Sequence, residues 1–228
     1  MAKETPGFAG FPKETLSFLC VLRANNSKEW FDAHRNDYDQ FFVDPAKAFV
    51  EAMGPRLRKI APNIAAEPRI NGSIFRINRD TRFSKDKRPY KDHLTLTFWD
   101  GDKKTSSSCF FFRISPDNTF IGCGFHQGSS DQLKAFRAAV GDEIAGKSLA
   151  RLAKKLRGQG YELAGQHYKR FPKGFSEDGP AAEFLLHNSL YIVHEDSPTI
   201  ACSKAILETC LKHWKAISPL HKWLVENL

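Results

Sequence analysis

The chain has 228 residues, of which 41% are hydrophobic, and a formal net charge of +8 at pH 7. Its 19 Phe and 4 Trp residues supply enough apolar surface for a packed core, which excludes a wholly disordered protein. The chain shows neither an apolar run of membrane-spanning length nor the apolar segment of a signal peptide, so we expect a soluble, cytoplasmic protein without a membrane span.

Apolar residues at helical spacing fill the first part of the chain, residues 1–68. The first helix is expected over residues 11–22, and Asn26 is positioned to cap the second. Asp44-Pro45 is a typical start for a third helix, which Pro62 would end. We therefore predict a helical layer here.

The pattern changes from helical to alternating in residues 69–126, which predicts a sheet that also carries a basic loop. Strands are expected over residues 74–77, 93–99, 108–114 and 119–125. Gly122 and Gly124 would leave one face of the last strand without side chains. A neighbouring helix packed on that face is the first explanation, and a ligand is the alternative.

The last part, residues 127–228, reads as helices with one or two short strands, the clearer of them at residues 190–193. A long helix should follow Ser197-Pro198 and break at Ser218-Pro219. Together the three parts predict one α+β domain, in which helices flank an antiparallel meander.

Positive charge is concentrated in two segments of the chain. Residues 69–93 contain eight Lys or Arg and three Asp, a net of +5, and residues 147–173 carry a net of +7. The rest of the chain sums to −4. If the two segments meet in the fold, they form a surface that attracts anions.

The candidate binding residues follow from this charge pattern. Arg76, Arg79 and Arg82 recur at intervals of three around a single Asp80, which cannot neutralise three guanidinium groups. His126 ends the glycine-containing strand, and it or His93 is placed to move a proton. The full set of predicted anion-binding residues is Arg76, Arg79, Arg82, Lys85, Lys87, Tyr90, Lys91, His126, Lys169, Arg170 and Lys173.

No common enzyme motif occurs in the chain, so its catalytic residues, cofactor and oligomeric state stay undetermined at this point. The five cysteines include no Cys-x-x-Cys pair and the histidines show no ligand spacing, so no metal site is expected. Three hypotheses remain: a pocket for a phosphorylated or carboxylated small molecule, a nucleic-acid-binding module, and a structural or partner-binding protein whose basic loop is an internal salt-bridge network. The small-anion pocket is preferred, because the prolines and aromatics suggest a shaped cavity.

Three sequence blocks carry a family resemblance. They are Asn25-Asn26-Ser27-Lys28-Glu29-Trp30-Phe31 with His34, Arg35 and Tyr38; Arg79-Asp80-Thr81-Arg82-Phe83-Ser84-Lys85-Asp86-Lys87 with Pro89-Tyr90-Lys91; and Lys169-Arg170-Phe171-Pro172-Lys173-Gly174-Phe175. With these blocks the chain resembles the bacterial and fungal family called domain of unknown function 2461. The resemblance implies a single-domain architecture that spans nearly the whole chain, and it implies no activity.

Overall fold

A computed structural model describes residues 7–101, 108–175 and 177–228. In chain order the elements are α1 (Lys13–Ala24), α2 (Lys28–Ala33), α3 (Arg35–Tyr38), the π-helix η1 (Asp39–Val43), α4 (Asp44–Leu57), β1 (Leu94–Trp99), β2 (Cys109–Ile114), β3 (Thr119–Phe125), α5 (Ser130–Gly141), α6 (Glu143–Gly158), β4 (Leu163–Gln166), the 3-10 helix η2 (Ala182–Leu186), β5 (His187–Asp196), the 3-10 helix η3 (Pro198–Cys202) and α7 (Ile206–Asn227).

The strands form one antiparallel sheet with the order β1-β2-β3-β5-β4. The predicted α+β fold is confirmed, and β1, β2 and β3 are the predicted meander. β5 corrects the expectation of a short strand at residues 190–193, because it is ten residues long and pairs with both β3 and β4. Backbone pairing on both sides extends the strand beyond its apolar centre.

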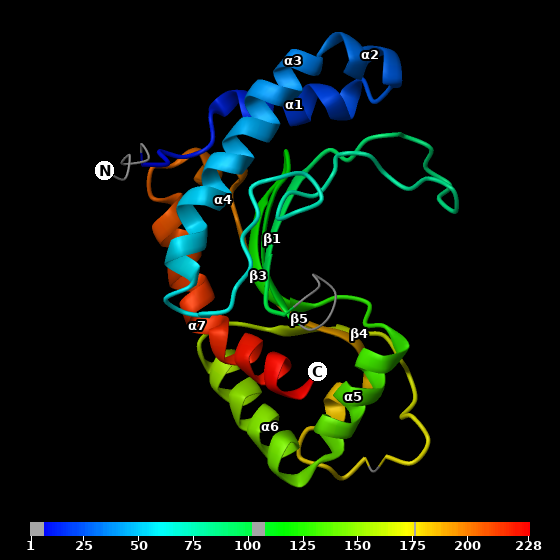
Figure 1. Cartoon of the computed structure of the whole chain (residues 1–228). Helices are drawn as coiled ribbons and strands as arrows, with labels where there is room; N and C mark the ends of the chain where they lie inside the picture. The colour runs from blue at the N-terminus through cyan, green and yellow to red at the C-terminus, as the bar shows by residue number, and fades with distance from the viewer. Residues whose placement is uncertain (1–6, 102–107, 176) are drawn as a thin grey trace.

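Helices α4 and α7 run along one face of the sheet, α1 to α3 lie at one end of the molecule, and α5 and α6 lie at the other (Figure 1). The face toward α4 and α7 carries the core, including the fully buried Phe98, Phe110 and Phe112. Trp214 of α7 is also fully buried, and its indole N–H donates to the carbonyl oxygen of Gly122 at 3.0 Å. This hydrogen bond fixes α7 against the central strand.

The glycines of β3 are covered by neighbouring strands, which corrects the expected helix packing. A Cβ atom on Gly122 would lie 2.3 Å from the ring of Phe111 and 2.2 Å from the carbonyl oxygen of Ile192. Cys123, on the opposite face, donates from its thiol to the carbonyl of Ile217 in α7. The glycines therefore make room for the aromatic side chains of β2 and β5.

Two helix boundaries differ from the sequence prediction. Ser27, and not Asn26, caps α2, because its hydroxyl accepts a hydrogen bond from the Trp30 N–H. Asp44 does not cap a separate helix, because the chain passes from α3 through η1 into α4 without leaving the helical region. Phe42 lies within this π-helical turn and is fully buried.

Pro219 lies inside α7, although a break was expected there. A proline removes the N–H that would bond to the carbonyl four residues earlier, here Lys215. The Ser218 hydroxyl donates to that carbonyl at 3.0 Å and replaces the missing bond. The expected strand at residues 74–77 is also absent, since this segment makes only isolated bridges, among them Ile74 with Leu96.

The close approach at Gly124 leads to a stability prediction. A Cβ atom there would lie 2.1 Å from the Leu190 carbonyl oxygen, and its φ of +136° is strained for any other residue. Gly124→Ala should lower the free energy of unfolding by more than about 2 kcal/mol. Gly158→Ala is the matched control, because Gly158 ends α6 with nothing within 4 Å of its Cβ position. Urea unfolding measures both, and equal stabilities for the two variants would contradict the packing described here.

Candidate functional site

The basic loop, residues 76–93, is held against the N-terminal helices by its Tyr90. The Asn26 side chain forms two hydrogen bonds with the Tyr90 backbone, each 3.0 Å long, one to the N–H and one to the carbonyl. The Tyr90 ring stacks on Phe31 of α2, with 4.2 Å between ring centroids, and is buried. Asn26 is therefore a docking residue for the loop, and Tyr90 is unavailable for stacking on an external base.

Carboxylates inside the basic loop neutralise several of its arginines. Asp86 accepts from Arg79 at 2.8 Å and from Arg88 at 2.7 Å, and Asp80 accepts from Arg82 at 2.7 Å. These contacts, led by that with Arg88, hold the pKa of Asp86 well below its usual range. The internal salt-bridge network considered from the sequence thus exists in part, although it uses loop carboxylates and not those of the N-terminal helices.

The other predicted cations of the loop are spread along it. Lys87 donates to the Thr81 carbonyl at 2.9 Å, whereas Lys85 and Arg76 are exposed on its outer side. Phe83, in the middle of the loop sequence, is 95% exposed. Figure 1 shows the loop extending away from the sheet, past α2.

A pocket of about 190 Å³ lies between the basic loop and β2. It is lined by Arg79, Arg88, Tyr90, Lys91, Asp92, His93 and Arg113. We call it the basic pocket. Its lining contains four Lys or Arg side chains and one Asp, and that Asp already binds Arg23 at 2.8 Å outside the pocket.

Lys91 and Arg113 are the two pocket cations for which the described residues provide no carboxylate partner. The Lys91 ammonium donates to the Arg76 carbonyl at 2.7 Å, and the buried Nε of Arg113 has no hydrogen-bond partner among the described residues. Burial lowers the pKa of both groups, and the charges of Arg76 and Arg113 lower that of Lys91 further. The charge of Asp92 partly opposes this decrease at Arg113, but among the described residues no carboxylate forms an ion pair with either cation. Desolvated cations without a paired carboxylate destabilise the empty pocket and favour a bound anion.

His93 lies beside Arg113 in the same pocket. Its Nδ1 is 3.0 Å from Arg113 Nη2 and 3.3 Å from Asp92 Oδ1. Because a guanidinium only donates, Nδ1 accepts from Arg113 and carries no proton for Asp92. Burial and the charge of Arg113 lower the pKa of His93 to about 4, which keeps the imidazole neutral.

The structure separates the remaining predicted residues from the basic pocket. His126 follows the C-terminal end of β3. His93 lies at the opposite end of the sheet, because the next residue, Leu94, pairs with Ile114, which in turn pairs with Thr119 at the start of β3. Lys169, Arg170 and Lys173 are exposed in the segment after β4, which lies at the α5 end of the molecule (Figure 1). The two basic segments therefore do not form one surface.

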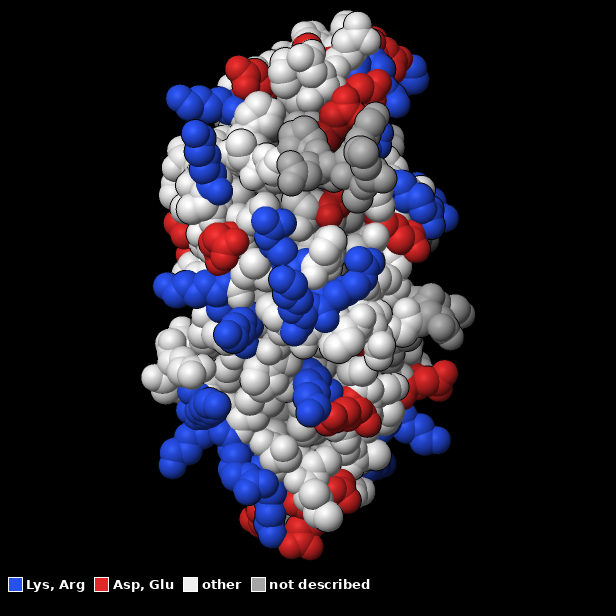
Figure 2. Space-filling model, turned by 60° about the vertical axis from the view of Figure 1, so that its left-hand side comes forward, with Lys and Arg blue, Asp and Glu red and all other residues white. Residues whose placement is uncertain are grey.

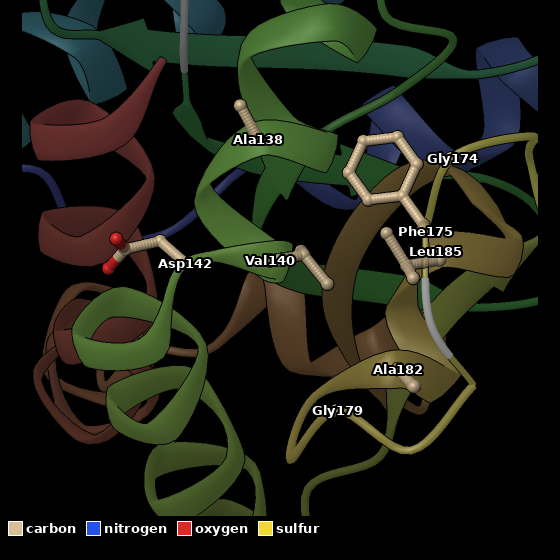
Figure 3. A pocket seen from close by; sticks show the side chains of 9 residues that line it. Ala138, Val140, Asp142, Gly174, Phe175, Gly179, Ala182 and Leu185 are labelled. Atoms are coloured by element: carbon tan, nitrogen blue, oxygen red, sulfur yellow. The ribbon is translucent and has the colours of Figure 1, made fainter.

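A pocket of about 330 Å³ lies beside the segment that holds Lys169, Arg170 and Lys173, where α5 meets α6. Its lining side chains are apolar apart from Asp142 (Figure 3), and the Phe175 ring lies close to Gly141. Asp142 turns its carboxylate away from this space and caps α6 by accepting from Ile144 N–H and Ala145 N–H. None of the three predicted cations lines this pocket.

A second cationic region was not recognised from the sequence. Arg56, Lys59, Lys212 and Lys215 line an open groove of about 470 Å³ between α4 and α7, in which Glu208 is the acidic lining residue. Figure 2 shows blue side chains gathered on this face, halfway along the molecule. The groove combines two pairs of residues, Arg56 with Lys59 and Lys212 with Lys215, that are far apart in the sequence, so no single segment reveals it.

Arg113 is the main residue of the basic pocket that sequence reasoning missed. It interrupts the run Cys109-Phe-Phe-Phe-Arg-Ile of β2, and an arginine within an apolar strand is the signal that was available. His93 was considered only as a group that moves a proton, and Arg88 was not included among the predicted binding residues. The pocket therefore combines one strand residue with several loop residues.

The described residues contain no group of three or more His, Cys, Asp and Glu side chains that could hold a metal ion. Within the same residues, no helix is both long enough and apolar enough to cross a bilayer.

The lowered pKa of His93 predicts acid sensitivity. The unfolded chain takes up a proton on His93 near pH 6.5, whereas the folded protein does so only near pH 4. Neutral His93 thus contributes up to about 3 kcal/mol to the free energy of unfolding above pH 6.5. This contribution is lost as the pH falls toward 4. His93→Gln should reduce the change in the free energy of unfolding between these pH limits, as measured by urea unfolding. His126→Gln, at an exposed position, is the control, and identical slopes for wild type and His93→Gln would contradict the burial of His93.

Comparison with known proteins agrees with the sequence resemblance. A family model described as "Conserved hypothetical protein (DUF2461)" matches residues 14–223. No curated protein matches the chain. The matched range contains all strands of the sheet and the whole basic loop. The chain therefore belongs to the DUF2461 family.

Proposed function

We propose that the protein binds the phosphate or carboxylate group of a small molecule in the basic pocket. The observation that carries this proposal is the pair of cations, Lys91 and Arg113, which lie partly buried without a carboxylate among the described residues. An incoming anion would compensate both charges and satisfy the Nε of Arg113.

The size and rigidity of the site support a small anionic group. A pocket of about 190 Å³ is below the usual range for drug-sized ligands, about 300–1,000 Å³, so it suits a head group whose remainder extends outward. The Asp86 ion pairs and the Asn26–Tyr90 hydrogen bonds hold the loop side of the pocket before any ligand binds. Such preorganisation lowers the entropic cost of binding.

The proposal concerns binding, and a catalytic step is left out. His93 is neutral near pH 7, because its pKa is lowered to about 4, and its Nδ1 accepts a hydrogen bond from Arg113, so no proton transfer by this residue is proposed. The five cysteines are all free thiols, which supports the expected cytoplasmic location.

Arg113→Met and Lys91→Met test the proposal. The wild-type melting temperature should rise with phosphate, sulfate, acetate or glycerol phosphate at constant ionic strength, because these ligands bind the folded state. Each substitution removes a charge-assisted contact and should weaken binding at least about tenfold. Arg82→Met is the matched control, since Arg82 pairs with Asp80 outside the pocket.

The same variants separate a binding role from a structural one. Removing an uncompensated buried charge should leave the unliganded protein as stable as wild type or more stable. A large loss of stability in Arg113→Met, or an equal response to anions in all three variants, would contradict the proposal. No response of the wild type to any anion would do the same.

A second candidate, a nucleic-acid-binding module, is favoured by one observation. Phe83 is 95% exposed in the basic loop, close to Arg82 and Lys85 in the sequence, and its ring lies 5.7 Å from the Arg82 guanidinium. Exposed aromatic rings among cations stack on the bases of single-stranded nucleic acid. This surface lies outside the basic pocket and is independent of it.

Phe83→Ala tests this second candidate. If the loop binds single strands, the substitution should weaken binding of oligo(dT) or oligo(U) about tenfold at 0.1 M salt, since stacking contributes about 1–3 kcal/mol per base. Fluorescence anisotropy measures the change. Ile144→Ala is the control, because Ile144 is also largely exposed but begins α6. Absence of binding by the wild type would remove this candidate, as would equal binding by Phe83→Ala.

A further inference from the structure

Asp92 is the acidic residue in the lining of the basic pocket. One of its oxygens, Oδ2, accepts from Arg23 Nε at 2.8 Å. Arg23 does not line the pocket, and its two other nitrogens donate to Asp117. Among the described residues, the second oxygen of Asp92, Oδ1, has a single hydrogen-bonding neighbour, His93 Nδ1 at 3.3 Å.

His93 has no proton to give to that oxygen. Arg113 Nη2 lies 3.0 Å from the same Nδ1 atom, and because a guanidinium only donates, the lone pair of Nδ1 accepts this hydrogen bond. A ring nitrogen that accepts in this way cannot also donate to Asp92. The Oδ1 atom therefore keeps its capacity to accept a hydrogen bond in the pocket, while the ion pair with Arg23 keeps the carboxylate ionised near pH 7.

The cations of the same pocket provide only donors. Arg113 Nε is buried and has no hydrogen-bond partner among the described residues. The Lys91 ammonium uses one of its three protons for the Arg76 carbonyl and has two more to offer. A bound anion consequently faces N–H donors and, at Asp92, one negatively charged acceptor. Such a site requires both unprotonated oxygens and a proton on the ligand.

Oxyanions differ in whether they supply that proton. Sulfate, carboxylates and phosphodiesters carry none near pH 7, so one of their oxygens at Asp92 would meet a like charge. Inorganic phosphate keeps at least one proton at this pH, and a phosphate monoester, whose second pKa is about 6, keeps one at that pH and below.

We propose that the basic pocket selects a phosphate group that retains a proton, either inorganic phosphate or a phosphate monoester. Its P–OH donates to Asp92 Oδ1, and its other oxygens accept from Arg113 Nε and the Lys91 ammonium. The inference rests on the anion site proposed above and narrows its ligand. It also makes Asp92 a specificity-determining residue, which excludes the phosphodiester backbone of a nucleic acid from this pocket.

Inorganic phosphate and sulfate are the probes, because both are small tetrahedral oxyanions and only phosphate carries a proton near pH 7. Calorimetry with the full chain at pH 7 and constant ionic strength should give a phosphate affinity at least about tenfold higher than that for sulfate, since one hydrogen bond to a charged group is gained and one like-charge contact is avoided.

Asp92→Asn tests the origin of the preference. The substitution removes the negative charge and introduces an amide donor, so sulfate should bind more tightly and the preference for phosphate should fall at least about fivefold. Asp117→Asn is the matched control, because Asp117 also pairs with Arg23 but lies outside the pocket. This variant should keep the wild-type preference. The ratio measured for the wild type tests the inference even if Asp92→Asn does not fold.

The outcomes separate this inference from the anion site itself. Equal binding of both anions by the wild type, with loss of both in Arg113→Met, would overturn the selection of a protonated phosphate and leave the anion site standing. Binding of neither anion would remove the site and the inference together. A folded Asp92→Asn variant that keeps the full preference for phosphate would also contradict the role of Asp92.

Discussion

The Asn26 side chain and the Tyr90 backbone form the contact on which the basic pocket depends. Two hydrogen bonds and the Tyr90–Phe31 stack fix the returning half of a long irregular loop against the N-terminal helices. Lys91, Asp92 and His93 follow Tyr90 directly, so the same contact places three pocket residues before β1 begins. The loop also has backbone hydrogen bonds of its own, from Arg79 N–H to the Pro89 carbonyl and from Lys91 N–H to the Ile77 carbonyl. Its exposed ion pairs contribute little to stability in water.

The charges of the loop divide into two groups with different roles. Arg79, Arg82 and Arg88 bind carboxylates that lie two or seven residues away, and such local pairs organise the backbone. Lys91 and Arg113 come from the loop and from β2, and they meet only in the folded protein. The net charge of a segment therefore overstates what it offers to a ligand, because three cations of the loop are already paired with carboxylates. The charge that is left for a ligand results from the meeting of loop and strand.

Sequence patterns predicted the elements that are determined by the residues within the element itself. The alternation of residues 93–99, 108–114 and 119–125 defined the meander, and periodic leucines defined α6. Predictions failed where a side-chain hydrogen bond that the local pattern does not reveal decides the outcome. Asn26 resembles a helix cap, but Tyr90, 64 residues later, uses its side chain. Pro219 resembles a helix end, but the neighbouring Ser218 replaces the missing hydrogen bond.

The same limit explains why the candidate site was only partly predictable. The basic loop is visible in the sequence because its charges are contiguous, whereas Arg113 is a single residue in an apolar strand. His126 was selected for its neighbouring glycines, yet those glycines accommodate Phe111 and Tyr191 and have no relation to a ligand. Composition can thus indicate an anion site, but only the strand register identifies its members.

Buried polar atoms without a hydrogen-bond partner among the described residues lie near both ends of β1. Arg113 Nε and His221 Nε2 are both buried and both without a hydrogen-bond partner among the described residues, while the core between them is apolar and closely packed. Folding stability alone would favour an apolar residue at either position, because burial of a polar atom without a hydrogen-bond partner lowers the free energy of unfolding. Of the two atoms, one belongs to a permanent cation and the other to a neutral ring near pH 7. The two ends of β1 therefore differ in charge, with a cation at Arg113 and a neutral ring at His221.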